Sequence, residues 1–238
     1  MLEIKHFTKT YKGGKKAVDD LCLTVEKGDI FGFIGHNGAG KTTTIRAVAG
    51  VLDFDGGEIL IDGVSVKQDP LACKKQIAYI PDNPDIYENL TGIQFLNFIG
   101  DVFRVAADER ERIVKQYADA FEITRNLGDL ISSYSHGMKQ KLTIISALLH
   151  SPRLLILDEP FVGLDPKAAH ILKTTMHELC RGGVAIFFST HVLDVAEKLC
   201  NKIAIIKGGR LLACGPTQEI RRGDSSLEDV FMELIDHA

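Results

Sequence analysis

The sequence has no long apolar run. Its apolar runs, such as residues 154–157 and 203–206, are the length of a strand and far short of the ~20 apolar residues that cross a bilayer as a helix. The first residues also lack the basic and then apolar pattern of a secretory leader. We therefore expect a chain that does not itself enter a membrane and that reaches one only through a partner.

Cysteine and tryptophan are also scarce, and the chain has no net positive charge. Among 238 residues there is no tryptophan, and the five cysteines are widely spaced without a Cys-x-x-Cys pair. This odd number and wide spacing favour free thiols in a reducing compartment, so we expect no metal or redox role for them. The net charge of −4 argues against a dedicated nucleic-acid binder, and no nucleic-acid partner is expected.

Glycine, by contrast, is concentrated at an informative place. Residues 35–42 read GHNGAGKT and match the phosphate-loop pattern G-x-x-x-x-G-K-[ST]. An apolar run (30–34) precedes them and a helical stretch follows, so backbone N–H groups and a helix N-terminus point at a phosphate chain. Lys41 would reach the β- and γ-phosphates, and the Thr42 hydroxyl would hold Mg²⁺. A glycine-rich turn without a ligand is the alternative. The expected nucleotide-binding residues here are Asn37, Gly38, Ala39, Gly40, Lys41, Thr42 and Thr43.

Two carboxylates end another apolar run, in the segment LLILDEP at residues 154–160. Ligands of open α/β sheets bind at the carboxyl ends of the strands, which is where Asp158 and Glu159 would lie. Asp158 is placed to hold Mg²⁺, and Glu159 to orient or deprotonate an attacking water. A strand that simply ends in a polar loop is the alternative.

The hydrophobic periodicity predicts the architecture. Leu2, Ile4 and His6 alternate with polar residues, which indicates β structure near the start of the chain. The period is helical from residue 91 to about 140, and apolar strands alternate with helices after residue 154. Strands that are apolar throughout indicate a parallel sheet covered on both faces. We expect a single domain over 1–238, with 1–82 and 151–238 as the catalytic core plus β subdomain and about 83–150 as a helical subdomain.

A further segment, SYSHGMKQK at residues 133–141, opens an amphipathic helix. A serine, a glycine and free N–H groups at a helix start make an anion site. The alternative is that Ser135 is an ordinary N-cap.

Taken in order, these motifs resemble those of the nucleotide-binding subunit of an ABC transporter. The resemblance implies an α/β P-loop NTPase fold with a RecA-like parallel sheet core, an antiparallel β subdomain and an α-helical subdomain, with ATP and Mg²⁺ as cofactors. The matching segments are Walker A (35–42), Walker B (154–158) with its catalytic glutamate (Glu159), the signature (135–140), the D-loop (162–165), the switch histidine (189–191) and the aromatic residue placed against adenine (Tyr11).

The resemblance also implies roles in a head-to-tail pair of such chains. Ser135 and Gly137 of one chain would close on the γ-phosphate bound by the other. His191 would hydrogen-bond that phosphate and help to orient the water, and Asp165 would tie the two halves together. Tyr11 would stack on adenine. A helix-cap histidine, a turn aspartate and an ordinary strand tyrosine are the alternatives for the last three residues.

Three departures from the family pattern stand out. Asp82 takes the place of the usual glutamine, so we expect it to approach the metal, directly or through water, without donating a hydrogen bond. The signature has Tyr134, His136 and Met138 where the family has leucine, glycine and glutamine. The tail at 226–231 is followed by few residues, so no appended regulatory domain is expected.

The signature variant, Asp82 and the tail together resemble ABC-2-type exporters. The resemblance implies an ATPase on the inner face of the cell membrane that powers a separate integral permease, with a second copy or a related ATPase subunit. We expect the permease to dock between Asp82 and about Arg104, near Tyr87 and the apolar group at 93–99. The alternative is a soluble non-transport ABC ATPase that acts on nucleic acid or the ribosome.

Overall fold

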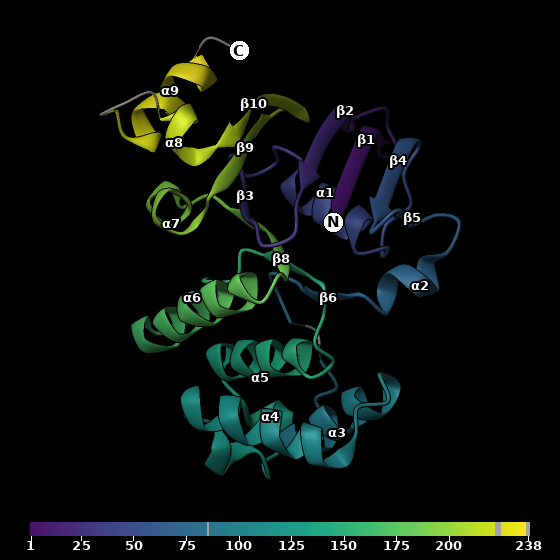
Figure 1. The fold of residues 1–238 in the computed structure, drawn as a ribbon, viewed down its shortest axis with the longest axis vertical. Helices are drawn as coiled ribbons and strands as arrows, with labels where there is room; N and C mark the ends of the chain where they lie inside the picture. The colour runs from purple at the N-terminus through teal and green to yellow at the C-terminus, as the bar shows by residue number, and fades with distance from the viewer. Residues whose placement is uncertain (85, 222–224, 237–238) are drawn as a thin grey trace.

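The computed structural model describes residues 1–84, 86–221 and 225–236, and within them two sheets organise the fold (Figure 1). The smaller sheet is antiparallel, in the order β2-β1-β4-β5. The larger sheet has the order β10-β9-β3-β8-β7-β6. The strands of the smaller sheet are β1 (Leu2–Thr10), β2 (Lys16–Val25), β4 (Gly56–Ile61) and β5 (Val64–Ser65). Those of the larger are β3 (Ile30–Ile34), β6 (Ile77–Ile80), β7 (Leu154–Asp158), β8 (Ala185–Thr190), β9 (Lys202–Lys207) and β10 (Arg210–Pro216).

The larger sheet is parallel from β9 to β6, as predicted, but β10 joins its edge antiparallel to β9. The parallel sheet core is thus present as predicted, and no strand was predicted at this edge. Gly208 and Gly209 have φ of 55° and 83° and connect the paired residues Lys207 and Arg210. Two successive residues with positive φ are what a tight two-residue hairpin turn requires. The Gly-Gly pair in the sequence thus indicates a hairpin that leads into β10.

Alternate residues of the central strands face two separate cores. Phe31 and Phe33 of β3 pack toward the antiparallel sheet and α1 (Lys41–Val48). Ile30 and Ile34 face the opposite side, where α6 (Pro166–Arg181) and α7 (Leu193–Leu199) lie. Because both faces are covered, the strand is apolar throughout and all five of its residues are buried.

The helices at 92–148 gather at the end of the molecule opposite the antiparallel sheet (Figure 1). Thr91 and Gln94 form a reciprocal capping box that starts α3. These helices are α3 (Gly92–Val102), α4 (Ala107–Ala120) and α5 (His136–Leu148), with short 3₁₀ turns at Thr124–Asn126 and Ile131–Ser133 between α4 and α5. The remaining helices are α2 (Pro70–Lys74), α8 (Thr217–Ile220) and α9 (Leu227–Asp236).

The alternation predicted for the first strand ends before His6. Leu2 and Ile4 are buried, but His6 is exposed and Phe7 takes the next buried position. A register shift between Ile4 and Phe7 marks a β-bulge, and His6 has a positive φ of 51°. The extra residue turns the histidine outward, which the pattern of apolar residues alone does not reveal.

In the part of the chain that the structure describes, no helix has the length and apolar character needed to traverse a bilayer.

Candidate nucleotide-binding and active site

The glycine-rich loop runs from the end of β3 to the start of α1. Gly38 and Gly40 have φ of 80° and 110°, conformations that residues with a side chain rarely adopt. A Cβ on Gly40 would also lie 2.6 Å from the Ala17 carbonyl oxygen. Glycine is therefore required at position 40 both for its conformation and for the close approach of β2.

The loop forms one wall of a pocket that collects most of the predicted site residues. Ala39 is buried behind the loop and not among the lining residues. The lining comprises the predicted residues Tyr11, Asn37, Gly38, Gly40, Lys41, Thr42, Thr43, Asp82 and Glu159, together with Lys15, Ala17 and His36. Segments far apart in sequence therefore meet at the carboxyl edge of the central sheet, as the motif spacing predicted.

Lys41 provides a buried positive charge in this pocket. Its side chain is only 6% exposed, and its ammonium lies 3.5 Å from Glu159 Oε1. It also donates a hydrogen bond of 2.6 Å to the Gly35 carbonyl oxygen. These contacts hold the buried ammonium at the loop, where it faces an anion that enters the pocket.

Glu159 lies between Lys41 and His191. Its Oε1 is 3.0 Å from His191 Nδ1 as well as close to Lys41, and its side chain is 13% exposed against 51% for His191. Glu159 has a positive φ of 47°, an uncommon conformation that recurs where function demands it. The carboxylate and the imidazole are thus already within hydrogen-bond distance, as general-base chemistry requires.

Asp158 lies beneath this pair at the end of β7 and is 1% exposed. Burial raises the pKa of its carboxyl group, and hydrogen bonds from the Ser189 and Thr42 hydroxyls oppose that rise. The Ser189 hydroxyl donates to Asp158 Oδ1 at 2.5 Å and accepts from the Glu159 backbone N–H at 3.1 Å. Ser189 therefore fixes the positions of both acidic residues, a role that the sequence did not indicate.

The three predicted metal-binding residues present the type of donor that Mg²⁺ takes. Thr42 and Asp82 line the pocket, and Asp158 is joined to Thr42 by a side-chain hydrogen bond. Hydroxyl and carboxylate oxygens suit a hard cation. A cation would also offset the cost of keeping the Asp158 carboxylate charged in a buried position. The residues present therefore fit the metal.

Tyr11 lies at the outer edge of the pocket, just beyond the end of β1. Its ring is exposed, its hydroxyl is 3.2 Å from the Thr43 hydroxyl, and the Lys9 ammonium lies 5.7 Å from the ring centroid. An exposed ring beside the phosphate loop is available to stack on a base.

Comparison with known proteins decides which family these features represent. The family model described as "ABC transporter" matches residues 18–162. The ABC-type transporter ATP-binding protein EcsA of Bacillus subtilis (strain 168) is 35% identical in an alignment of 238 positions that covers 98% of this chain and 96% of that protein. The chain belongs to the ABC transporter family. It is an ATP-binding subunit with ATPase activity, which confirms the resemblance inferred from the motifs.

Further relatives support the same assignment. The linearmycin resistance ATP-binding protein LnrL of Bacillus subtilis (strain 168) is 32% identical over all of this chain and 77% of its own length. A solved structure of an ATP-binding subunit of an ABC transporter superposes with a TM-score of 0.94, at 36% identity and 99% coverage of both chains. A dimeric post-hydrolysis structure of the cassette MJ0796 with ADP and Pi, 22% identical, shares the fold at a TM-score of 0.83 over 91% of this chain and 99% of that chain. The predicted fold class is confirmed.

The ABC signature lies outside the chain's own nucleotide pocket. Ser135 is exposed at the N-cap of α5, where its hydroxyl accepts the Met138 backbone N–H at 3.3 Å. Neither Ser135 nor Gly137 is among the described residues that line the pocket. The Tyr134 side chain is buried, and its hydroxyl donates to the Asn126 carbonyl oxygen at 2.5 Å. The replacement of leucine by tyrosine is therefore accommodated by a specific hydrogen bond.

The D-loop packs against the signature within the same chain. A Cβ on Gly163 would lie 2.4 Å from the His136 ring, and one on Gly137 would lie 2.8 Å from the Gly163 carbonyl oxygen. Asp165 caps α6 by accepting the Ala168 backbone N–H at 2.8 Å. Its other oxygen is 2.7 Å from the Lys141 ammonium, which lowers the pKa of the carboxyl group. Asp165 therefore joins α5 to α6 and does not reach the chain's own pocket.

Proposed function

We propose that this chain binds ATP with Mg²⁺, closes head to tail on a second copy or a related ATPase subunit, and thereby powers a separate membrane permease for export. In this account it lies on the cytoplasmic face of the cell membrane, held there by the permease. The whole of 1–238 acts as one ABC ATPase domain. Residues 83–150 form its helical subdomain, and 1–82 with 151–238 form the catalytic core and β subdomain.

The separation of two half-sites is the observation that carries the proposal. Lys41 and Glu159 line the pocket and His191 contacts Glu159 beside it, but Ser135 and Gly137 open α5 elsewhere on the surface. A helix start with exposed N–H groups and a hydroxyl suits an anion, yet the chain's own phosphate loop does not lie against it. A second chain, turned head to tail, would supply the phosphate. The fold shared with a dimeric cassette agrees with this arrangement.

The contacts of Glu159 suggest how ATP binding would change the site. Entry of a γ-phosphate would draw Lys41 and His191 toward its oxygens, because a phosphate carries more negative charge than one carboxylate. Glu159 would then be free to accept a proton from a water that attacks the phosphorus. Mg²⁺ bound by Thr42, Asp158 and Asp82 would neutralise charge that develops on the phosphate oxygens. After cleavage the closed pair would lose the charge that links its halves and reopen.

The expected permease-docking segment keeps several apolar side chains at the surface. Phe95 and Leu96 are buried in the helical subdomain, but Ile93, Phe98 and Tyr87 are exposed. The Tyr87 and Phe98 rings meet edge to face, with centroids 5.6 Å apart. Exposed aromatic pairs of this kind are enriched at protein interfaces.

A groove continues this surface toward the β subdomain. It is lined by Leu71, Lys74, Lys75, Val102, Phe103, Arg104 and His150. Leu71 and Val102 are exposed apolar residues, and the Phe103 and His150 rings stack at 3.7 Å. We assign the docking of a cytoplasmic permease helix to this groove and the Tyr87–Phe98 pair. Such a helix would contact both the core and the helical subdomain.

Export is supported by the relatives and by the sequence variants. LnrL is described as a linearmycin resistance protein, and removal of a compound from the cell is one way to resist it. The signature variant and Asp82, which resemble those of ABC-2-type exporters, point the same way. The transported substrate is chosen by the permease.

Co-purification tests the proposal directly. The tagged chain is expressed in its native host, the membranes are gently solubilised, and the captured proteins are identified. Recovery of a multi-spanning permease supports the proposal, and the sequence of that permease gives its class. Recovery of ribosomes or DNA-associated proteins without a permease would contradict it and favour a non-transport ATPase.

A further inference from the structure

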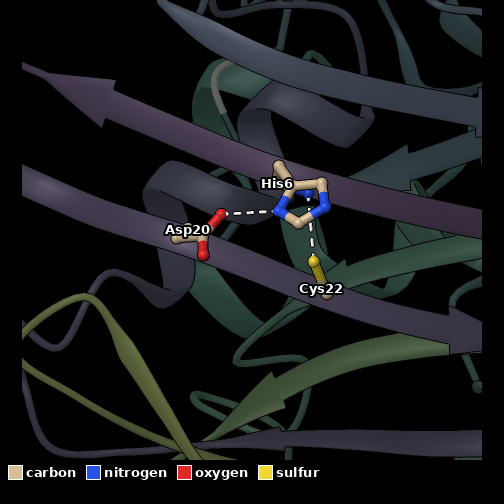
Figure 2. Close-up of side chains that lie close together, drawn as sticks. All are labelled: His6, Asp20 and Cys22. Atoms are coloured by element: carbon tan, nitrogen blue, oxygen red, sulfur yellow. Dashed lines mark hydrogen bonds and ion pairs between the residues drawn. The ribbon is translucent and has the colours of Figure 1, made fainter.

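Three possible metal ligands converge on the outer face of the antiparallel sheet, and none of them lines the nucleotide pocket (Figure 2). They are His6 of β1 and Asp20 and Cys22 of β2, and their ligand atoms all lie within 4.8 Å of one another. His6 Nδ1 is 2.8 Å from Asp20 Oδ1. The Cys22 sulfur accepts a hydrogen bond of 3.1 Å from the His6 backbone N–H.

A bulge in β1 brings His6 to this face. Ile4 pairs with Leu23 and Phe7 with Leu21, so β1 has one residue more than β2 between these two pairs. His6, with a φ of 51°, is turned to the outer face instead of joining Leu2 and Ile4 in the core. Gly57 of β4 supports the bulge from the other side, since a Cβ there would lie 2.3 Å from the His6 carbonyl oxygen.

A second, complementary bulge in β2 brings Asp20 to the same place. Between the pairs Phe7–Leu21 and Lys9–Val18, it is β2 that has the additional residue. Asp20 has a φ of 58° and its backbone N–H donates to the Thr8 hydroxyl at 3.1 Å. Cys22 lies two residues further along the strand, and residues i and i+2 of a strand share a face. The two irregularities thus collect three different donor types at one point.

We propose that His6, Asp20 and Cys22 form a site for a zinc-class divalent cation. An imidazole, a thiolate and a carboxylate are the ligand types that such cations take, and three protein ligands leave a fourth position for water. A thiolate and a carboxylate together balance the two positive charges of the cation. The nearby Lys5 ammonium is paired with Glu3 at 2.9 Å. The high exposure of His6 (76%) and Asp20 (69%) gives the ion free access.

Binding would replace the His6–Asp20 hydrogen bond with bonds from both residues to the ion, and would join β1 to β2 at the double bulge. No metal role was expected for a cysteine, because close spacing of ligands along the chain is the usual signal of a metal site. Here His6 and Cys22 are 16 positions apart and meet only when the strands pair.

Cobalt provides the test, because a cobalt–thiolate bond absorbs in the near ultraviolet whereas oxygen ligands at the nucleotide pocket do not. The purified full chain, without a histidine tag and without nucleotide, is titrated with Co²⁺ alone. Wild type, Cys22→Ser, His6→Asn and Cys214→Ser are compared. Cys214 is an exposed free cysteine outside the cluster and serves as the matched control. Circular dichroism without metal establishes that each variant is folded.

We expect one cobalt per chain with a thiolate absorption band in wild type and in Cys214→Ser. The band should disappear in Cys22→Ser, and His6→Asn should weaken binding by at least the ~10-fold that loss of an outer-shell partner costs. Absence of the band in wild type, or its persistence in Cys22→Ser, would overturn the proposal. If either variant does not fold, Asp20→Asn is tested in its place. A cobalt affinity equal to that of wild type in this variant would then overturn the proposal.

Discussion

At the scale of single residues, the account depends most on the acidic pair at the end of β7. Glu159 and Asp158 are neighbours in sequence, but the structure gives them different surroundings. Glu159 lies in the pocket beside Lys41 and His191, whereas Asp158 is buried beneath Ser189. We therefore expect substitutions of these two residues to have different effects on activity and stability.

Replacing Glu159 by glutamine should abolish turnover while ATP still binds. The amide keeps the shape of the side chain but cannot accept a proton from water, and loss of a general base costs ~10²–10⁴-fold in rate. Steady-state ATPase assays and equilibrium nucleotide binding measure the two effects separately. Turnover near the wild-type rate would show that another group is the base.

Replacing Asp158 by asparagine should stabilise the metal-free chain while removing Mg²⁺-dependent activity. Burial raises the pKa of the Asp158 carboxyl group, so its charged form disfavours the folded state. No difference in stability is expected below the ordinary carboxyl pKa, where the group is protonated in both states. The advantage of asparagine should grow as pH rises from the ordinary carboxyl pKa to the raised folded pKa and stay constant above it.

Thermal unfolding across this pH range, without metal or nucleotide, measures the Asp158 effect. A gain of a few degrees in Tm at neutral pH is expected. A Tm below that of wild type at neutral pH would mean that the Ser189 and Thr42 hydrogen bonds outweigh desolvation.

The positions of the side chains in the proposed active site could be predicted from sequence because their motifs are local. A strand, a turn and a helix start fix the phosphate loop, and one strand end fixes Asp158 and Glu159. The position of Ser189 between them could not be foreseen, because its hydroxyl meets Asp158 only through the parallel pairing of β7 with β8.

At the scale of secondary-structure elements, local sequence patterns indicate where helices start and where tight turns lie, but they do not indicate β-bulges. Thr91 and Gln94 have the sequence pattern of a capping box. Gly208 and Gly209 have that of a two-residue turn, although this turn was not predicted from the sequence. The bulges at His6 and Asp20 have no comparable sequence pattern. They depend on how three strands of the antiparallel sheet fit together, including the close approach of Gly57.

Thr91→Ala should destabilise the chain by about 1 kcal/mol, because it removes the hydroxyl that accepts the Gln94 backbone N–H at the start of α3. ATPase activity at a temperature well below the Tm should be unchanged, since Thr91 is not among the described residues that line the pocket. Urea unfolding measures the loss. Gln94→Ala tests the other half of the box, and a stability equal to wild type in both variants would show that the box contributes nothing.

At the scale of the whole molecule, we propose that two surfaces bind partners: the half-site at the start of α5 and the exposed apolar group of the helical subdomain. The sequence predicted both, since one is a motif and the other an apolar segment. It could not separate the buried Phe95 and Leu96 from the exposed Phe98, because that division depends on how α3 packs against α5.

The double variant Tyr87→Ser, Phe98→Ser should lose the permease but keep its own ATPase activity within about twofold. The two rings pack on each other at the surface, so their removal exposes little of the core. Val51→Ser, at another exposed apolar residue, is the control and should retain the permease. Full recovery of the permease with the double variant would show that the permease docks at another surface.

The central claim is that two chains complete each other's ATP sites, and the mass of the ATP-bound chain tests it most directly. Sedimentation of Glu159→Gln with Mg²⁺ and ATP should give twice the 26.2 kDa of one chain, because the uncleaved phosphate holds both halves. Ser135→Arg added to this background should return the mass to that of one chain while ATP still binds. A chain that binds ATP but remains at 26.2 kDa, or a dimer that survives Ser135→Arg, would contradict the account.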